Sequence, residues 1–194
     1  MNKSDQAPNL VLVPLLLAGL IVIAALTRLL PHPPNFTPVA AIALFAGAYF
    51  AGRGWAIVVP LVALLVSDLA LAAVHGGSYL QHLASPVALA VYACILLATV
   101  LGFGMRGKVS SARVLGGSVA GAVLFFAITN FMVWLTASAV PGYAPCQVDI
   151  ATCYAAAIPF FHWTLLGTLF YSALLFGGFE LLRRRIPALR AQTA

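Results

Sequence analysis

Two ionisable side chains, Asp68 and His162, stand well inside long apolar stretches of this sequence. Ionisable groups are costly inside a membrane-spanning helix and mark functional sites by default. A carboxylate and an imidazole can bond to the polar edges of a small molecule. No Ser-His-acid set, paired carboxylates or phosphate-binding glycine loop accompanies them, so an integral membrane enzyme would depend on these two residues alone. The chain is therefore predicted to bind a molecule and not to be an enzyme.

Further polar residues are expected at a similar depth. Asn130 and Trp134 are four residues apart and share a helix face. Arg28 ends the first apolar stretch, His32 follows in a Pro-rich connector, and Tyr79 lies in a polar loop expected on the same side, together with two more histidines at 75 and 82. The predicted substrate-binding site comprises Arg28, His32, Asp68, Tyr79, Asn130, Trp134 and His162.

Each of these residues also has a purely structural interpretation. Asp68 could cap a helix or pair with Arg28 with no ligand involved. His162, between two aromatic residues, could be a hydrogen-bonded core histidine, and Trp134 could anchor its helix at the membrane interface. Their convergence on one side of the expected bundle favours a binding site.

Cysteine and histidine spacing predicts neither a metal site nor a cofactor, because no H-x3-H, H-E-x-x-H or C-x-x-C pattern occurs. Cys146 and Cys153 both fall on the expected outer side of the membrane, which is oxidising in bacteria. A disulfide between them is one interpretation and two free thiols are the other. Cys94 lies in mid-span and is expected to act as a small apolar residue.

The composition is that of a membrane protein. Of the 194 residues, 63% are hydrophobic and only 7% are charged, and the mean hydropathy is +1.05. A soluble domain is about 25% charged, so most of this surface is expected to face the lipid bilayer. The Lys and Arg residues that give the chain its net charge of +6 lie at expected helix ends, as membrane insertion requires. Their position argues against nucleic acid as a partner.

Proline and glycine breaks divide the chain into six apolar stretches, and we predict an all-α bundle of six transmembrane helices forming a single domain, 1–194. The first stretch is longer than a signal peptide's apolar region and lacks a small-x-small cleavage site, so it is interpreted as a retained span. Small residues recur every fourth position at Ala43, Gly47 and Ala51, which predicts close helix packing or docking of a partner helix. The predicted spans are 10–30, 38–50, 55–74, 86–103, 114–139 and 155–182.

Charge asymmetry predicts the orientation. With six spans, nine of the ten Lys and Arg residues lie on one side and only Arg28 lies on the other. The positive-inside rule then places both termini in the cytoplasm, as a multi-pass protein of the bacterial inner membrane. The nine are Lys3, Arg53, Arg106, Lys108, Arg113, Arg183, Arg184, Arg185 and Arg190.

Two stretches resemble an uncharacterised bacterial family of small integral membrane proteins. One is RLLPHPPNFTPVAAIALFAGAYF at 28–50, and the other, at 129–181, begins with TNFMVWL and ends with CYAAAIPFFHWTLLGTLFYSALLFGGFEL. That family is similar to the substrate-binding S components of energy-coupling-factor (ECF) vitamin transporters. The resemblance implies a six-helix fold that binds a vitamin-like molecule near the outer surface, with outer loops closing over it. Some solitary relatives are similar to cobalamin transporters, one group of which uses a cysteine toward the cobalt.

This sequence departs from those relatives at several positions. The loop after Asp68 reads HGGSYLQHLAS and offers histidines where that cysteine is expected. His162, Trp163 and Thr168 stand where members of the family often have Arg, Asn and Asp. No A-x-x-x-A docking motif occurs between residues 10 and 30. An energising ECF-type module or a solitary role both remain open.

We therefore expect an S-component-like transport or substrate-capture protein that binds a small vitamin-like molecule, with cobalamin or a related compound among the candidates. The alternative is a structural or assembly subunit of a membrane complex, in which the polar groups only fix the register of the helices.

Overall fold

The computed structural model of the chain describes residues 7–138, 144–186 and 189, and every regular element in these ranges is helical. Three of the elements, α8, η3 and α9, form one continuous rod through a π-helical turn. The elements are α1 (Ala7–Leu26), the 3₁₀ turn η2 (Thr27–Leu29), α2 (Val39–Tyr49), α3 (Arg53–His75), α4 (Gly77–Leu83), α5 (Pro86–Phe103), α6 (Ser111–Thr136), α7 (Ala144–Val148), α8 (Ile150–Ser172), the π turn η3 (Ala173–Gly177) and α9 (Gly178–Arg185).

Local sequence signals set several of these boundaries. Ser85, Ser110 and Asp149 are N-caps whose side chains accept a hydrogen bond from a backbone N–H three residues later. Pro86 stands in the first turn of α5, where its missing donor has no cost. Gly76 ends α3 with φ of 73°, which a residue with a side chain adopts only with strain.

Within the described residues, five helices are long and apolar enough to cross a membrane, and they overlap five of the six predicted spans. Large apolar side chains such as Leu15, Val62 and Phe170 are exposed on the surface of these helices, an arrangement compatible with lipid contact. Residue 139, the predicted end of the fifth span, lies outside the described residues, and so do Lys3 and Arg190.

The remaining predicted span contains the short helix α2, which has 11 residues. At 1.5 Å per residue α2 is about 16 Å long, roughly half of the hydrocarbon thickness. Every residue of α2 is buried, so this helix faces protein and not lipid. The described part of the chain is therefore an all-helical bundle with five candidate spanning helices arranged around a short central one.

Close backbone contact holds α2 in the centre. A Cβ added at Gly47 would lie within 3.0 Å of the backbone of both Thr99 and Gly102 on α5, so only glycine permits this approach. At the end of α2, the Arg106 guanidinium donates to the carbonyl oxygens of Gly47 at 2.9 Å and Phe50 at 2.8 Å. Carbonyls that the helix leaves unpaired are thus satisfied by a side chain.

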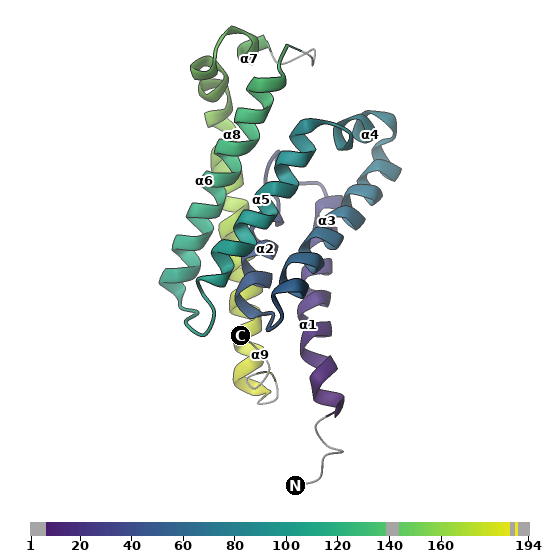
Figure 1. Cartoon of the computed structure of the whole chain (residues 1–194), viewed down its shortest axis with the longest axis vertical. Helices are drawn as coiled ribbons and strands as arrows, with labels where there is room; N and C mark the ends of the chain where they lie inside the picture. Colours follow the sequence, from purple (N-terminus) through teal and green to yellow (C-terminus); the bar gives the residue numbers. More distant parts are fainter. Residues whose placement is uncertain (1–6, 139–143, 187–188, 190–194) are drawn as a thin grey trace.

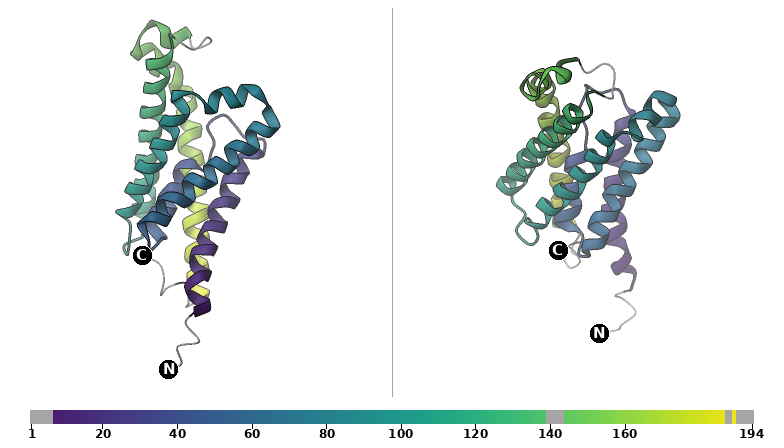
Figure 2. Two further views of the ribbon diagram at one scale, coloured as in Figure 1. Left: turned by 45° about the vertical axis from the view of Figure 1, so that its right-hand side comes forward. Right: turned by 45° about the horizontal axis from the view of Figure 1, so that its top comes forward.

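The bundle has two arms that diverge (Figure 1). One arm contains α1, α3, α4 and α5, and the other contains α6, α7 and α8; α2 packs against helices of both arms. Both views in Figure 2 show α4 and α7 at the tips of the diverging arms. We call this end of the bundle the cavity end.

We call the opposite end the basic end. Here lie the start of α3, the connection between α5 and α6, and α9 (Figure 1). These segments carry seven of the nine residues predicted on one side, while Arg28, in η2, lines the cavity between the arms. The seven are Arg53, Arg106, Lys108, Arg113, Arg183, Arg184 and Arg185.

Candidate functional site

An ion pair near the cavity end joins the turn after α1 to α3, within one arm of the bundle. Arg28 Nη1 lies 2.6 Å from Asp68 Oδ1, and the exposed fractions of the two side chains are 12% and 5%. Arg28 stands in the turn that follows α1, and Asp68 lies two turns before the end of α3, against which α1 packs. Because both charges are removed from solvent, each depends on the other for compensation.

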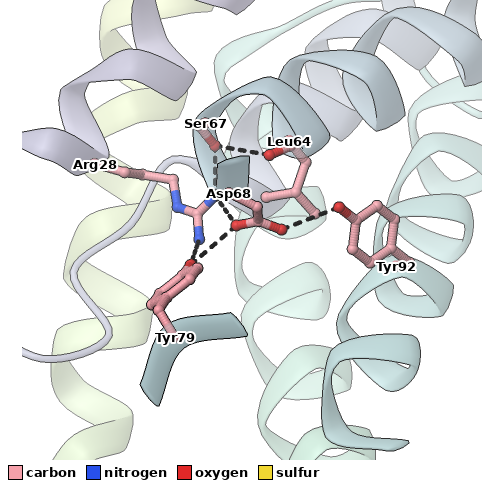
Figure 3. A network of polar contacts seen from close by, with 6 residues as sticks. All are labelled: Arg28, Leu64, Ser67, Asp68, Tyr79 and Tyr92. Atoms are coloured by element: carbon pink, nitrogen blue, oxygen red, sulfur yellow. Dashed lines mark hydrogen bonds and ion pairs between the residues drawn. The ribbon is translucent and has the colours of Figure 1, made fainter. Parts of the chain in front are cut away.

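Neutral hydroxyl groups complete the coordination of this pair (Figure 3). Asp68 Oδ1 also accepts a hydrogen bond from the Tyr79 hydroxyl at 3.0 Å, and Oδ2 accepts one from the Tyr92 hydroxyl at 3.0 Å. Arg28 donates to the Tyr79 hydroxyl at 3.1 Å and to Ser67 Oγ. Elements α3, α4 and α5 are thus joined to the end of α1 through one polar network.

Tyr79 is suited to its place between the two charges. Burial raises the pKa of its phenol above the ordinary value of 10.0, so the hydroxyl remains protonated at neutral pH. A protonated phenol can accept from the guanidinium and donate to the carboxylate at the same time.

The pair lies in the wall of a cavity of about 590 Å³ between the two arms. Four of the seven residues predicted from the sequence line this cavity: Arg28, Asp68, Tyr79 and Asn130. Aromatic rings form much of the remaining surface, contributed by Tyr92, Phe125, Phe126 and Phe160. The cavity volume is within the range of about 300–1,000 Å³ that small-molecule sites occupy.

Part of the cavity wall is non-helical backbone. Pro34, Asn35 and Thr37, from the connector between η2 and α2, line the cavity. Asn35 has a φ of 67°, and α8 packs so closely here that a Cβ on Gly167 would lie 2.8 Å from the Thr37 nitrogen. The Pro-rich connector is therefore held between α8 and the cavity.

A disulfide bond stands at the cavity's rim. Cys146 of α7 and Cys153 of α8 are bonded, with their Cα atoms 4.1 Å apart, and both residues line the cavity. Val133 and Trp134 of α6 pack against this pair of cysteines and Ala137. The bond attaches the short helix α7 to the start of α8.

The structure does not bring His32, Trp134 or His162 into the cavity. His32 is exposed, and its Nδ1 lies 2.6 Å from the Leu30 carbonyl oxygen. Trp134 packs beside the disulfide. His162 is exposed on α8, with its ring centroid 4.6 Å from that of Trp163. Trp134 and His162 were expected at the depth of the cavity, but their side chains lie on helix faces that do not line it.

Tyr92, which donates a hydrogen bond directly to Asp68, was not among the predicted site residues. Tyr92 is a mid-helix tyrosine in an apolar stretch, and that alone is a signal, because a buried phenol needs a hydrogen-bond partner. Asn35 and Thr129 were also missed; both line the cavity. Thr129 precedes Asn130 and donates its hydroxyl to the Phe125 carbonyl oxygen, so it resembles an ordinary helix-bound threonine.

The cavity wall offers hydrogen-bonding groups and aromatic rings to a ligand. Polar groups and rings are present, and within the described residues no three His, Cys, Asp or Glu side chains gather as a metal site would require. The arrangement can enclose a ring and bond to its polar edge.

Comparison with curated proteins and with solved structures finds no match. Comparison with protein families finds one over residues 9–189, described as "Family of unknown function (DUF6580)". This match includes every element that contributes to the cavity, from η2 to α8. The helical membrane-type chain built around the Arg28–Asp68 pair therefore belongs to the DUF6580 family.

Proposed function

We propose that this protein captures a small molecule from outside the cell in the cavity between its two arms, as a transport protein similar to the S components of ECF transporters. The main support for this proposal is the cavity itself, because its wall combines a buried ion pair with non-helical backbone. Inside a membrane, non-helical backbone is tolerated only where it is buried in protein or lines a cavity. Broken helices of this kind occur at the binding sites of many transporters.

The proposed topology has six passes. The connector at 30–38 and the half-length helix α2 together return the chain from the cavity end to the basic end, in place of a full spanning helix. Under the positive-inside rule the basic end faces the cytoplasm of the bacterial inner membrane. The cavity then opens to the outer side, where the Cys146–Cys153 disulfide is stable.

The size of the cavity favours a compact vitamin-like substrate. A volume of about 590 Å³ suits a drug-sized molecule. Cobalamin is considerably larger, so a cobalamin-like substrate would require α4 and α7 to move apart. The sequence also lacks an A-x-x-x-A stripe in its first span, which supports capture by the solitary protein over capture with an ECF module.

The alternative function is that of a structural or assembly subunit. The specific observation in its favour is that Arg28 and Asp68 have partners without any ligand. In that case the polar network would only fix the positions of α1, α3, α4 and α5.

Native mass spectrometry of the protein, released gently from nanodiscs, distinguishes the two. Capture predicts a protein peak with a small-molecule mass excess that collisional activation removes. A protein that carries only lipid, or that copurifies with other membrane subunits and no small molecule, would support the structural alternative. An ATPase in the same spectrum would support an ECF-type module.

A further inference from the structure

We infer that the substrate captured here is an uncharged, ring-containing molecule with an amide-like polar edge. This inference rests on the proposed function and specifies the chemical class of its ligand. It follows from the charges, the rings and the unsatisfied hydrogen-bonding groups of the cavity wall.

The wall of the cavity carries one ion pair and one histidine. Among the described residues, Arg28 and Asp68 are the only Arg, Lys, Asp or Glu side chains that line it, and they neutralise each other at 2.6 Å. His82 is the only histidine in this described lining. No Arg, Lys, Asp or Glu side chain of the described lining is left over to compensate a charged ligand.

A charged ligand would have to break the pair. An anion would need to take Arg28 from Asp68, which is 5% exposed and would keep its negative charge without a counter-ion. A cation would need to take Asp68 from Arg28 and from the hydroxyls of Tyr79 and Tyr92. Uncompensated burial of either charge carries a large penalty, so neither exchange favours binding.

Neutral hydrogen-bonding capacity does remain. Asn130 donates one amide hydrogen to the Phe126 carbonyl oxygen at 2.8 Å, which leaves its second N–H and its oxygen to pair with a ligand. The Thr129 oxygen can accept, since its hydrogen is bound to Phe125. A primary amide or the edge of a nitrogen heterocycle matches this combination of a donor and two acceptors.

The rings of the cavity suit a flat apolar body beside that polar edge. Phe125 and Phe126 of α6 line the cavity together with Tyr92 of α5 and Phe160 of α8. Aromatic side chains favour ring-containing partners through stacked or edge-to-face contact.

Three probes of equal size test the charge rule: 2-naphthamide, 2-naphthoate and 2-naphthylmethylammonium. Their dissociation constants for the purified wild-type protein in nanodiscs are measured at neutral pH by intrinsic tryptophan fluorescence and by thermal stabilisation. We expect 2-naphthamide to bind at least about tenfold more tightly than either charged probe, a difference of about 1.4 kcal/mol.

A matched pair of alanine replacements shows where the probes bind. Ala157 lines the cavity, whereas Ala155 is exposed on the same helix and is absent from the cavity wall. Ala157→Trp should fill the cavity and abolish the response to 2-naphthamide, and Ala155→Trp should retain it.

Two charge variants test the origin of the preference. Asp68→Asn leaves Arg28 without its counter-ion and should raise the affinity for 2-naphthoate relative to 2-naphthamide by about tenfold. Arg28→Gln should do the same for 2-naphthylmethylammonium. The wild-type ranking decides the inference even where either variant fails to fold.

The outcomes separate the inference from the proposed function. Tighter binding of a charged probe by the wild-type protein, lost in Ala157→Trp, would overturn the uncharged class while supporting capture in this cavity. No response to any of the three probes would overturn the cavity as a small-molecule site, and with it both proposals.

Discussion

Tyr92 and Arg28 approach the Asp68 carboxylate from opposite sides, Tyr92 binding Oδ2 and Arg28 binding Oδ1 (Figure 3). Tyr92 comes from α5 and Arg28 from the turn after α1, so the two residues are 92 − 28 = 64 positions apart in the sequence. A single carboxylate on α3 therefore joins three parts of the bundle at the wall of the cavity.

Loss of that carboxylate's charge should destabilise the fold. Asp68→Asn leaves a guanidinium that is 12% exposed without its counter-ion, and breaking a buried pair costs about 3–5 kcal/mol. Thermal unfolding in nanodiscs measures the effect. Asp149→Asn is the matched control, because Asp149 is an exposed N-cap and asparagine caps equally well. Equal stability of the two variants would show that the pair contributes little.

The Tyr92 hydrogen bond should be coupled to the charge on Asp68. Tyr92→Phe removes a bond to a charged acceptor and should lower the free energy of unfolding by about 1.5–3 kcal/mol. In the Asp68→Asn background the same replacement should cost less than about 1 kcal/mol, since the acceptor is then neutral. A double-mutant cycle from unfolding curves measures this coupling; strict additivity would argue against the geometry of Figure 3.

Asn130 and His162 should differ in their effect on binding, although both were predicted site residues. Asn130 lines the cavity and His162 is exposed outside it. Asn130→Ala should weaken 2-naphthamide binding by roughly two- to tenfold, because the loss of one neutral hydrogen bond changes the binding free energy by that amount. His162→Ala should leave the dissociation constant unchanged. The reverse order would mean that the ligand binds against the outer face of α8.

The Cys146–Cys153 disulfide should form in the cell without being essential for folding. It closes a loop with a sequence separation of 7, so its removal should cost roughly 2 kcal/mol. Alkylation before and after reduction, read by peptide mass, tests its presence. Full labelling of both thiols without reductant would contradict it. The Cys146→Ser and Cys153→Ser double variant should still yield a monodisperse protein.

Orientation can be measured with reporter fusions. A fusion after Lys108, at the basic end, and one after Arg190 should both report the cytoplasm, whereas one after Gln147 in α7 should report the outer side. Opposite locations for the first two fusions would be incompatible with a six-pass chain.

Much of the helical layout followed from the sequence because proline, glycine and polar breaks are local signals. The predicted span at 86–103 matches α5, and the span at 55–74 matches α3 to within two residues at its start. The short helices α4 and α7 were not predicted, since five or seven residues without a clear apolar period give no pattern to detect. The predicted span at 38–50 corresponds to α2, whose complete burial depends on Gly47 and Gly102 meeting across two helices.

The candidate site was predicted only in part. Arg28 and Asp68 were identifiable because charges are rare and costly inside apolar stretches. Depth along the membrane normal can be estimated from position in a span, but the direction of a side chain depends on how the helices rotate against one another. His162 and Asn130 illustrate this: both were expected near the same depth, and only Asn130 lines the cavity.

The most direct test of small-molecule capture is native mass spectrometry of Ala157→Trp and Ala155→Trp prepared side by side with the wild-type protein. We predict that the wild-type protein and Ala155→Trp carry the same copurified small molecule, and that Ala157→Trp, with an indole in the cavity, carries none. Retention of that molecule by Ala157→Trp, or a wild-type protein that carries only lipid, would contradict the proposal.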